Sequence, residues 1–284
     1  MQENKSRVAD VTFCFLVTKD LVKEQIWRAW FDRLRALKLN FNIITHVSPR
    51  QKAHVQSDWL WATLLPDACL VPSEWAWVMQ AQLALYAYAL AEAPAAWYTL
   101  HSESCVPLVT PERFIEQFQQ FKAHTFLRYG KAWWTPTPVP NDRANLHLLP
   151  PEYHWAHPQW SILCHEDLAQ VVSIAAADEN QLTTTLVKGH AAEESFLAIF
   201  LYKINNFKNV VKKATTLVDW QRSAGGGSPY TFREWTAADE KVVAALRDEK
   251  DQDYLFLRKI GPTFPDEVLV AWTDAGGTYK HVDL

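Results

Sequence analysis

A short polar segment, Ser102-Glu103-Ser104, follows an apolar run at residues 97–100 and carries a single carboxylate. The apolar run predicts a buried strand, and the polar segment predicts the turn at the strand's carboxyl end. Ligands of open α/β sheets bind at that end of the strands. Many enzymes that handle sugar nucleotides place two carboxylates there, which hold a divalent metal against the diphosphate. A chain with one carboxylate would need other positive charges to neutralise a diphosphate.

Two adjacent cations, Arg258 and Lys259, are the best candidates for those charges, because they end a second apolar run at residues 254–257. Neighbours on a strand face opposite sides of the sheet, so we expect Arg258 to point away from a diphosphate that Lys259 contacts. Arg233, near a glycine-rich loop at residues 223–230, is a further possible cation. The alternative is that all three are ordinary surface charges.

The composition is that of a globular protein with a large core and no unusual charge. The chain has 284 residues, 49% of them hydrophobic, with fourteen tryptophans and a net charge of −4. Such a length and composition fit one large α/β domain. The absence of a basic excess argues against nucleic-acid binding. The four cysteines lack Cys-x-x-Cys spacing, which argues against zinc, and Asp251-x-Asp253 is better interpreted as a solvated turn than as a metal motif.

The order of elements indicates an α/β fold with a parallel sheet. Residues 11–17 and 41–47 are predicted strands, and the helical spacing of residues 21–37 between them predicts a strand–helix–strand unit. A proline-rich stretch at residues 129–158 predicts a long loop of functional interest. The remaining predictions are helices at 74–91, 111–121, 165–177, 193–203 and 237–248, a strand at 159–164, and a β-like tail at 264–284.

Several segments together resemble one family, the Core-2/I-branching glycosyltransferases. The similar stretches, in the family's order, are Phe15–Phe31, Asn42–His46, Trp97–Leu108, Glu193–Phe196, and Asp219-Trp220 followed by Phe256–Lys259. The resemblance implies a GT-A-like, Rossmann-type sandwich with a mostly parallel central sheet flanked by helices. We expect a single domain over residues 1–284, with the nucleotide-sugar side at about 8–125 and the acceptor side and diphosphate clamp at about 126–284.

The resemblance also implies that Glu194 is the catalytic base, since it matches the second acid of the family's Asp-Glu pair. Direct displacement at an anomeric carbon needs a carboxylate that takes the acceptor hydroxyl's proton. The first acid of the pair is Glu193 here. The alternative is that Glu193 and Glu194 form a solvated first turn of a helix, where carboxylates are favoured anyway.

Other positions are assigned by the resemblance or by their place at strand ends, each with a structural alternative such as a turn cap or a core residue. These are Thr18 and His46 for the nucleotide, Arg233, Arg258 and Lys259 for the diphosphate, and Ser102, Glu103, Gln159, Trp160, Asp219 and Trp220 for the donor sugar or the acceptor.

The predicted function is an inverting, metal-independent glycosyltransferase that moves a sugar of the GlcNAc, xylose or glucuronic acid class from a UDP-sugar to a glycan hydroxyl. We expect no metal or other cofactor and no nucleic-acid partner. Two alternatives are a catalytically inactive glycan-binding protein on the same fold and a glycoside hydrolase, which would need a second carboxylate. No segment has the length and hydrophobicity of a signal or membrane span, so a cytoplasmic protein is expected, although relatives usually work in the Golgi lumen.

Overall fold

A six-stranded sheet forms the centre of the molecule, in the order β2-β1-β3-β8-β5-β9. The computed structural model describes residues 8–205, 207–225, 227–247 and 254–274. The strands are β1 (Ala9–Val17), β2 (Phe41–Val47), β3 (Ala95–His101), β5 (Thr125–Phe126), β8 (Ile162–Cys164) and β9 (Val210–Val211). The β1–β2, β1–β3 and β5–β9 pairs are parallel, whereas β8 runs antiparallel to both of its neighbours.

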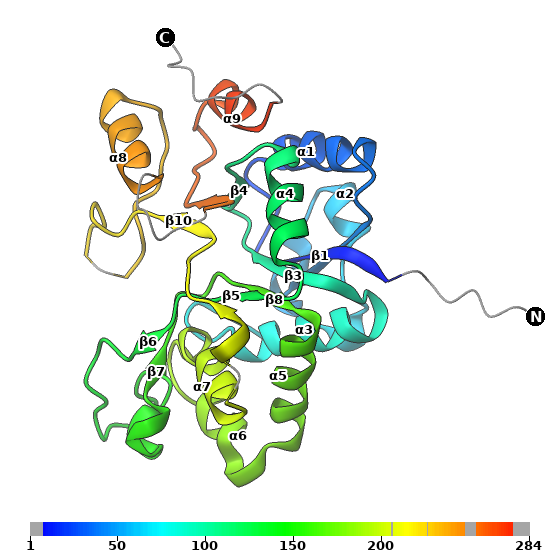
Figure 1. Cartoon of the computed structure of the whole chain (residues 1–284). Helices are drawn as coiled ribbons and strands as arrows, with labels where there is room; N and C mark the ends of the chain where they lie inside the picture. Colours follow the sequence, from blue (N-terminus) through cyan, green and yellow to red (C-terminus); the bar gives the residue numbers. More distant parts are fainter. Residues whose placement is uncertain (1–7, 206, 226, 248–253, 275–284) are drawn as a thin grey trace, which may run out of the picture.

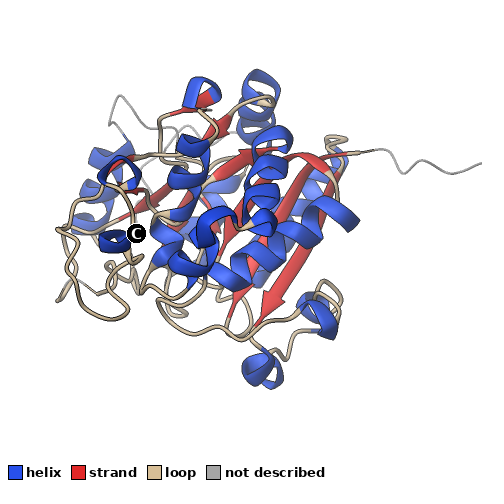
Figure 2. Cartoon of the chain, turned by 90° about the horizontal axis from the view of Figure 1, so that it is seen from below, coloured by secondary structure: helices blue, strands red, loops and turns tan. Residues whose placement is uncertain are grey.

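Helices cover both faces of this sheet, as Figures 1 and 2 show. On one face lie α3 (Met79–Glu92), α5 (His165–Ala177) and α7 (Phe196–Lys203), and on the other lie α1 (Glu24–Ala36) and α4 (Pro111–Phe121). The predicted α/β class, a mostly parallel sheet flanked by helices, is confirmed at this level. The bounds of α4 and α5 are the predicted ones, and the Thr110 side chain caps α4 by accepting from the Arg113 N–H at 3.2 Å.

An aromatic cluster joins α1 to the central strand. The Phe13 ring of β1 lies 4.9 to 6.5 Å, between centroids, from the rings of Trp27, Trp30 and Phe31. Both indole N–H groups are satisfied, since Trp27 donates to the Cys105 carbonyl and Trp30 to the Val109 carbonyl, each at 2.9 Å. A tryptophan can therefore fill this core without leaving a buried donor unpaired.

A smaller sheet, in the order β10-β11-β4, stands beside the main one and has its own apolar cluster. Its strands are β10 (Thr216–Val218), β11 (Phe256–Arg258) and β4 (Val106–Pro107), covered by α8 (Ala237–Arg247) and α9 (Asp266–Thr273). The prediction of a β-like tail was wrong for residues 266–273. Val268, Leu269 and Trp272 recur at helical spacing and are buried in the second cluster, which a strand would not achieve.

The remaining elements are short. They are α2 (Asp58–Trp61), α6 (Leu182–Val187), and β6 (Gly130–Lys131) paired with β7 (Trp155–Ala156). The predicted loop at 129–158 is mostly irregular, apart from these two strands and two single turns of 3-10 helix. α3 begins at Met79 rather than Glu74, because Ala76 has a positive φ of 62° and the Trp77 N–H closes a turn on the Glu74 carbonyl.

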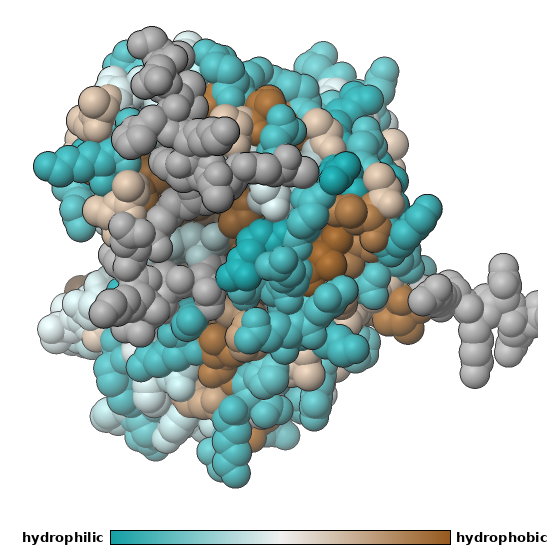
Figure 3. All heavy atoms as spheres, turned by 45° about the horizontal axis from the view of Figure 1, so that its top comes forward, coloured by the Kyte–Doolittle hydropathy of each residue, from teal (hydrophilic) through white to brown (hydrophobic). Residues whose placement is uncertain are grey.

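The face seen in Figure 3 is largely hydrophilic, with apolar side chains in separate patches. Cys14, Cys105 and Cys164 are buried free thiols, and Cys69 is a half-buried one. No helix in the described ranges is long and apolar enough to cross a membrane.

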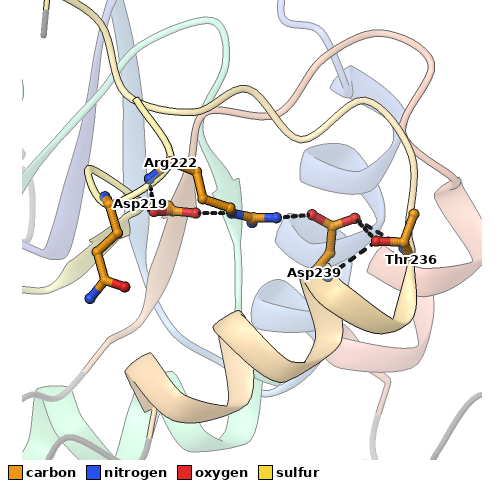
Figure 4. Close-up of polar contacts among 5 residues, drawn as sticks. Asp219, Arg222, Thr236 and Asp239 are labelled. Atoms are coloured by element: carbon orange, nitrogen blue, oxygen red, sulfur yellow. Dashed lines mark hydrogen bonds and ion pairs between the residues drawn. The ribbon is translucent and has the colours of Figure 1, made fainter. Parts of the chain in front are cut away.

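A polar network ties the loop after β10 to the start of α8 (Figure 4). The Arg222 guanidinium donates to Asp219 at 2.6 Å and to Asp239 at 2.7 Å, and both carboxylates are buried. The Thr236 amide donates to the Asp239 carboxylate, and the Thr236 hydroxyl accepts from the Asp239 amide, so the pair forms the predicted cap of α8. Burial raises the pKa of Asp239, but the hydrogen bonds from Thr236 and Arg222 outweigh it and hold that pKa below its ordinary value.

Replacement of Arg222 by Ala should lower the free energy of unfolding at pH 7 by about 3 kcal/mol, since it removes the cation that pairs with two buried carboxylates. The deficit should shrink as the pH falls toward about 4, because Arg222 helps to hold the pKa of Asp239 down and the freed Asp239 carboxylate can then protonate. Urea unfolding at the two pH values measures both effects. Arg113→Ala, which breaks an exposed pair with Glu116, is the control and should cost under about 1 kcal/mol. Equal losses in the two variants would contradict the assignment.

Candidate active site

The carboxyl ends of β1 and β3 bring Thr18 next to Glu103. The two strands are parallel neighbours, so the residues that follow them lie at the same edge of the sheet. The Thr18 hydroxyl donates to the Glu103 carboxylate at 3.3 Å. Ser102 and Ser104 are buried beside it, with their hydroxyl oxygens 3.2 Å apart. The predicted strand-end turn is therefore a small polar cluster with one carboxylate.

Arg258 reaches this cluster from the smaller sheet. Its Nε donates to the Ser102 hydroxyl at 3.3 Å, and its guanidinium carbon lies 4.7 Å from the centroid of the Trp160 ring. Trp160 is only 7% exposed, so in this structure its ring packs against Arg258 and little of it faces solvent. Burial lowers the pKa of Arg258, and the negative charges of Glu103 and Glu194 act against that shift. Both carboxylates are thus within electrostatic range of this cation.

Lys259 directly follows Arg258 at the end of β11. Its Nζ donates to the Ser228 hydroxyl at 3.4 Å. Burial and the charge of Arg258 lower the Lys259 pKa, while Glu103 raises it. The two cations have different hydrogen-bond partners, Ser102 for Arg258 and Ser228 for Lys259, and β11 ends at Arg258. Which of the two faces a diphosphate stays a prediction.

Glu194 lies on a single turn of 3-10 helix, η6 (Ala192–Glu194), rather than in the predicted α-helix. Ser195 has φ −137° and ψ −39°, which separates this turn from α7. The Glu194 carboxylate forms an ion pair with Arg143. Its main-chain carbonyl accepts from the His157 N–H at 2.8 Å. Because His157 directly follows β7, this bond holds the turn against the end of the proline-rich loop.

Arg143 is a site residue that the sequence interpretation missed. It comes from the proline-rich loop, and its guanidinium carbon lies 4.2 Å from the Trp134 ring centroid and 5.2 Å from that of Trp133. The loop itself was flagged as functional, and the Trp-Trp pair in it was a usable signal. The pairing with Glu194, 51 positions further on, is a tertiary contact that no local pattern encodes.

Glu193 has a different environment from Glu194. It is 6% exposed, and one of its carboxyl oxygens is buried without a hydrogen-bond partner. Burial raises its pKa to about 7, and the neighbouring Glu194 charge adds to the rise. Glu193 lines a cavity of about 200 Å³ that also includes Ser48 and Trp77. The alternative of two equally solvated carboxylates is therefore wrong for Glu193.

His46 is fully buried, and its Nε2 accepts from the Val71 N–H at 3.0 Å. Burial lowers its pKa to about 4, so the ring is neutral near pH 7. This surrounding favours a structural role for His46 over contact with a nucleotide.

The other predicted residues lie around the site with differing exposure. Asp219 is buried, and its carboxylate is occupied by Arg222 and by loop amides, whereas Trp220 beside it is 51% exposed. Gln159 is half-buried next to Trp160. Arg233 is exposed, and the N–H of the preceding Phe232 donates to the Lys259 carbonyl at 2.9 Å. Roles for these four in donor or acceptor binding stay predictions.

Within the residues that the structure describes, no group of three or more His, Cys, Asp and Glu side chains is placed to hold a metal ion. Asp251 and Asp253 lie outside the described residues. Metal independence stays a prediction.

Comparison with known proteins yields one strong match. A family model described as Core-2/I-Branching enzyme matches residues 11–247. No curated protein matches the chain. Among solved structures, 2-C-methyl-D-erythritol 4-phosphate cytidylyltransferase from Thermus thermophilus is similar over 67% of this chain and 98% of that one, at 14% identity and a TM-score of 0.26. A score that low supports no argument about the fold.

The raised pKa of Glu193 gives a pH dependence that can be measured. The folded state holds the proton up to about pH 7, whereas the unfolded chain releases it near 4.5. The protonated Glu193 side chain therefore makes its full contribution to the free energy of unfolding below about pH 4.5, and this contribution is lost as the pH rises to about 7. The free energy of unfolding of Glu193→Gln, taken relative to that of the wild type, should therefore be higher at pH 8 than at pH 4.5 by about 1–3 kcal/mol. Chemical unfolding at both pH values tests this, with the exposed Glu152→Gln as the control; parallel pH profiles for all three proteins would contradict it.

Proposed function

Because the chain belongs to the Core-2/I-branching enzyme family, a family of glycosyltransferases, we propose that it moves a sugar from a UDP-sugar to a glycan hydroxyl, with inversion and without a metal ion. The observation that carries the proposal is the position of Arg258. This cation lies at the Ser102–Ser104 turn and interacts electrostatically with Glu194. This effect of the Glu194 charge on Arg258 supports an arrangement in which the proposed clamp and the proposed base serve one donor.

Glu194 is the proposed base. The acceptor hydroxyl oxygen forms a bond to the anomeric carbon while the bond from that carbon to the β-phosphate oxygen breaks. The hydroxyl proton passes to the Glu194 carboxylate, and UDP leaves with the electron pair. A single attack from the side opposite the leaving group inverts the configuration, so one carboxylate suffices. Arg143 holds the Glu194 carboxylate in place before the acceptor binds.

Lys259 and Arg258 are the proposed partners of the departing diphosphate. Negative charge grows on the leaving group in the transition state, and cations already fixed in place stabilise it without reorganisation. Arg258 is held by Ser102 and Trp160, and Lys259 is held by Ser228. The UDP and metal-free parts of the proposal rest on this cationic pair and on the single carboxylate of the Ser-Glu-Ser turn.

The function is tested by incubating the protein with a panel of UDP-sugars and mixed glycan acceptors in the presence of EDTA, with products followed by mass spectrometry. We expect transfer, with the new linkage opposite in configuration to the donor by NMR. Complete loss in EDTA that Mn²⁺ restores would contradict metal independence. Release of free sugar with no transfer to any acceptor would favour the hydrolase, and neither product would favour a glycan-binding protein.

Glu194→Gln keeps the size of the side chain and removes its basicity. Turnover should fall by about 10²- to 10⁴-fold, the usual contribution of a general base, while UDP affinity changes little. Steady-state rates and calorimetric titration with UDP measure the two quantities. Glu193→Gln is the matched comparison and should retain more activity. If Glu194→Gln turns over normally and Glu193→Gln is inactive, the base is Glu193.

Lys259→Ala should weaken UDP binding by about tenfold or more, because a charged contact to phosphate is lost. Calorimetric titration with UDP measures it, and thermal unfolding without ligand checks that the fold is intact. Lys122→Ala, an exposed lysine at the end of α4, is the control and should bind UDP as the wild type does. Unchanged UDP affinity in Lys259→Ala would move the clamp elsewhere, with Arg233 as the next residue to test.

A further inference from the structure

Two exposed tryptophans border the Arg143–Glu194 pair. Trp75 is 72% exposed and Trp133 is 60% exposed, although tryptophan is normally mostly buried. In the described part of the chain, only Trp61 and Trp220 are other tryptophans with comparable exposure. Exposed indole faces next to a candidate base need an explanation beyond core packing.

Trp133 is joined to the pair through Arg143. The Arg143 guanidinium packs against Trp134 and Trp133 and at the same time binds the Glu194 carboxylate. The Trp133 and Trp134 rings meet edge to face, with centroids 5.0 Å apart. Trp133 is therefore held in position by its neighbours while most of its surface stays open.

Trp75 reaches the same place from a different segment. Its ring lies 5.6 Å from the His190 ring, and the main chain of His190 bridges to that of Arg143. The Ala191 N–H also donates to the Ala76 carbonyl at 2.7 Å, which ties the Trp75 segment to the turn that carries Glu194. The two exposed tryptophans are thus linked through His190 and Arg143, and the turn that carries Glu194 joins the same segments.

Polar groups lie beside this surface. The Trp77 ring lies 6.1 Å from that of His190 and forms part of the wall of the cavity next to Glu193. Glu74, Gln80 and Arg50 line the same cavity, and the unpartnered oxygen of Glu193 is buried there. Flat aromatic faces beside carboxylate, amide and guanidinium groups match the chemistry of a sugar ring, which has an apolar C–H face and a rim of hydroxyls.

We propose that Trp75 and Trp133 bind the sugar rings of a saccharide acceptor, and that the cavity beside Glu193 takes hydroxyls of the same saccharide. The proposal rests on the proposed function, because it assigns the acceptor side of that site. It commits to a carbohydrate acceptor and not to a hydroxyl on an extended peptide or a lipid chain, since an indole ring packs flat against the apolar C–H face of a sugar ring.

The kinetic test compares Trp75→Ala, Trp133→Ala and the control Trp61→Ala, which removes an exposed tryptophan on α2 packed against Lys52. Loss of one stacking contact should raise the acceptor KM about three- to tenfold, with UDP affinity and donor hydrolysis unchanged. Trp75→Phe and Trp133→Phe should recover part of the loss, which a merely structural role would not predict. Acceptor KM values equal to the wild type in both Ala variants would overturn the proposal.

A binding test without donor separates this proposal from the proposed function. Saturation-transfer NMR with lactose, N-acetyllactosamine, cellobiose and xylobiose should show ring protons of at least one disaccharide in contact with the wild type, and weaker contact in Trp75→Ala and Trp133→Ala only. Binding of none of these saccharides, or equal binding by all variants, would overturn the proposal. Tryptophan-dependent binding without transfer from any nucleotide sugar would support the saccharide surface while removing the transferase.

Discussion

Main-chain pairing between β4 and β11 is the constraint on which the candidate site depends. The Leu108 N–H donates to the Leu255 carbonyl, and the Ile260 N–H donates to the Ser104 carbonyl, each at 2.9 Å. These bonds flank Arg258 and Lys259, so the two cations are positioned by the backbone on either side of them. The pairing is buried in the second apolar cluster, where an unpaired amide or carbonyl would be costly. The location of the charges is therefore fixed before any ligand contributes.

Each charged group named for the site has an opposite charge near it. Arg143 neutralises Glu194, and Glu103 offsets the burial of both Arg258 and Lys259. Because electrostatic interactions strengthen as water is excluded, the opposite charges stabilise one another in this partly buried space. Glu193 is the contrasting case. It has the same side chain as its neighbour, yet it is buried and the Arg143 guanidinium pairs with Glu194 instead, so burial raises the pKa of Glu193 to about 7.

The sequence predicted what local patterns encode. Thr110 with Pro111 marks the start of α4, and the buried runs give β1, β2 and β3 with their order in the chain. It also placed polar residues at the carboxyl ends of the strands, and the family resemblance is confirmed by the match over residues 11–247.

What escaped prediction depends on contacts between distant segments. Ser195 adopts a non-helical conformation that no propensity signals, so Glu194 lies on a 3-10 turn ahead of α7. Arg143 gains its role only through a partner on that turn. α9 is different, since the helical spacing of Val268, Leu269 and Trp272 is a local pattern that the prediction of a β-like tail overlooked.

The second cluster also has a consequence for synthesis on the ribosome. It unites Ile26 and Val106 with residues from 217 to 272, so it cannot close until the residues up to 272 have emerged. Closing a loop of about 150 residues also makes this contact slow to form. The six-stranded sheet can assemble first, and Arg258 and Lys259 then join the site last.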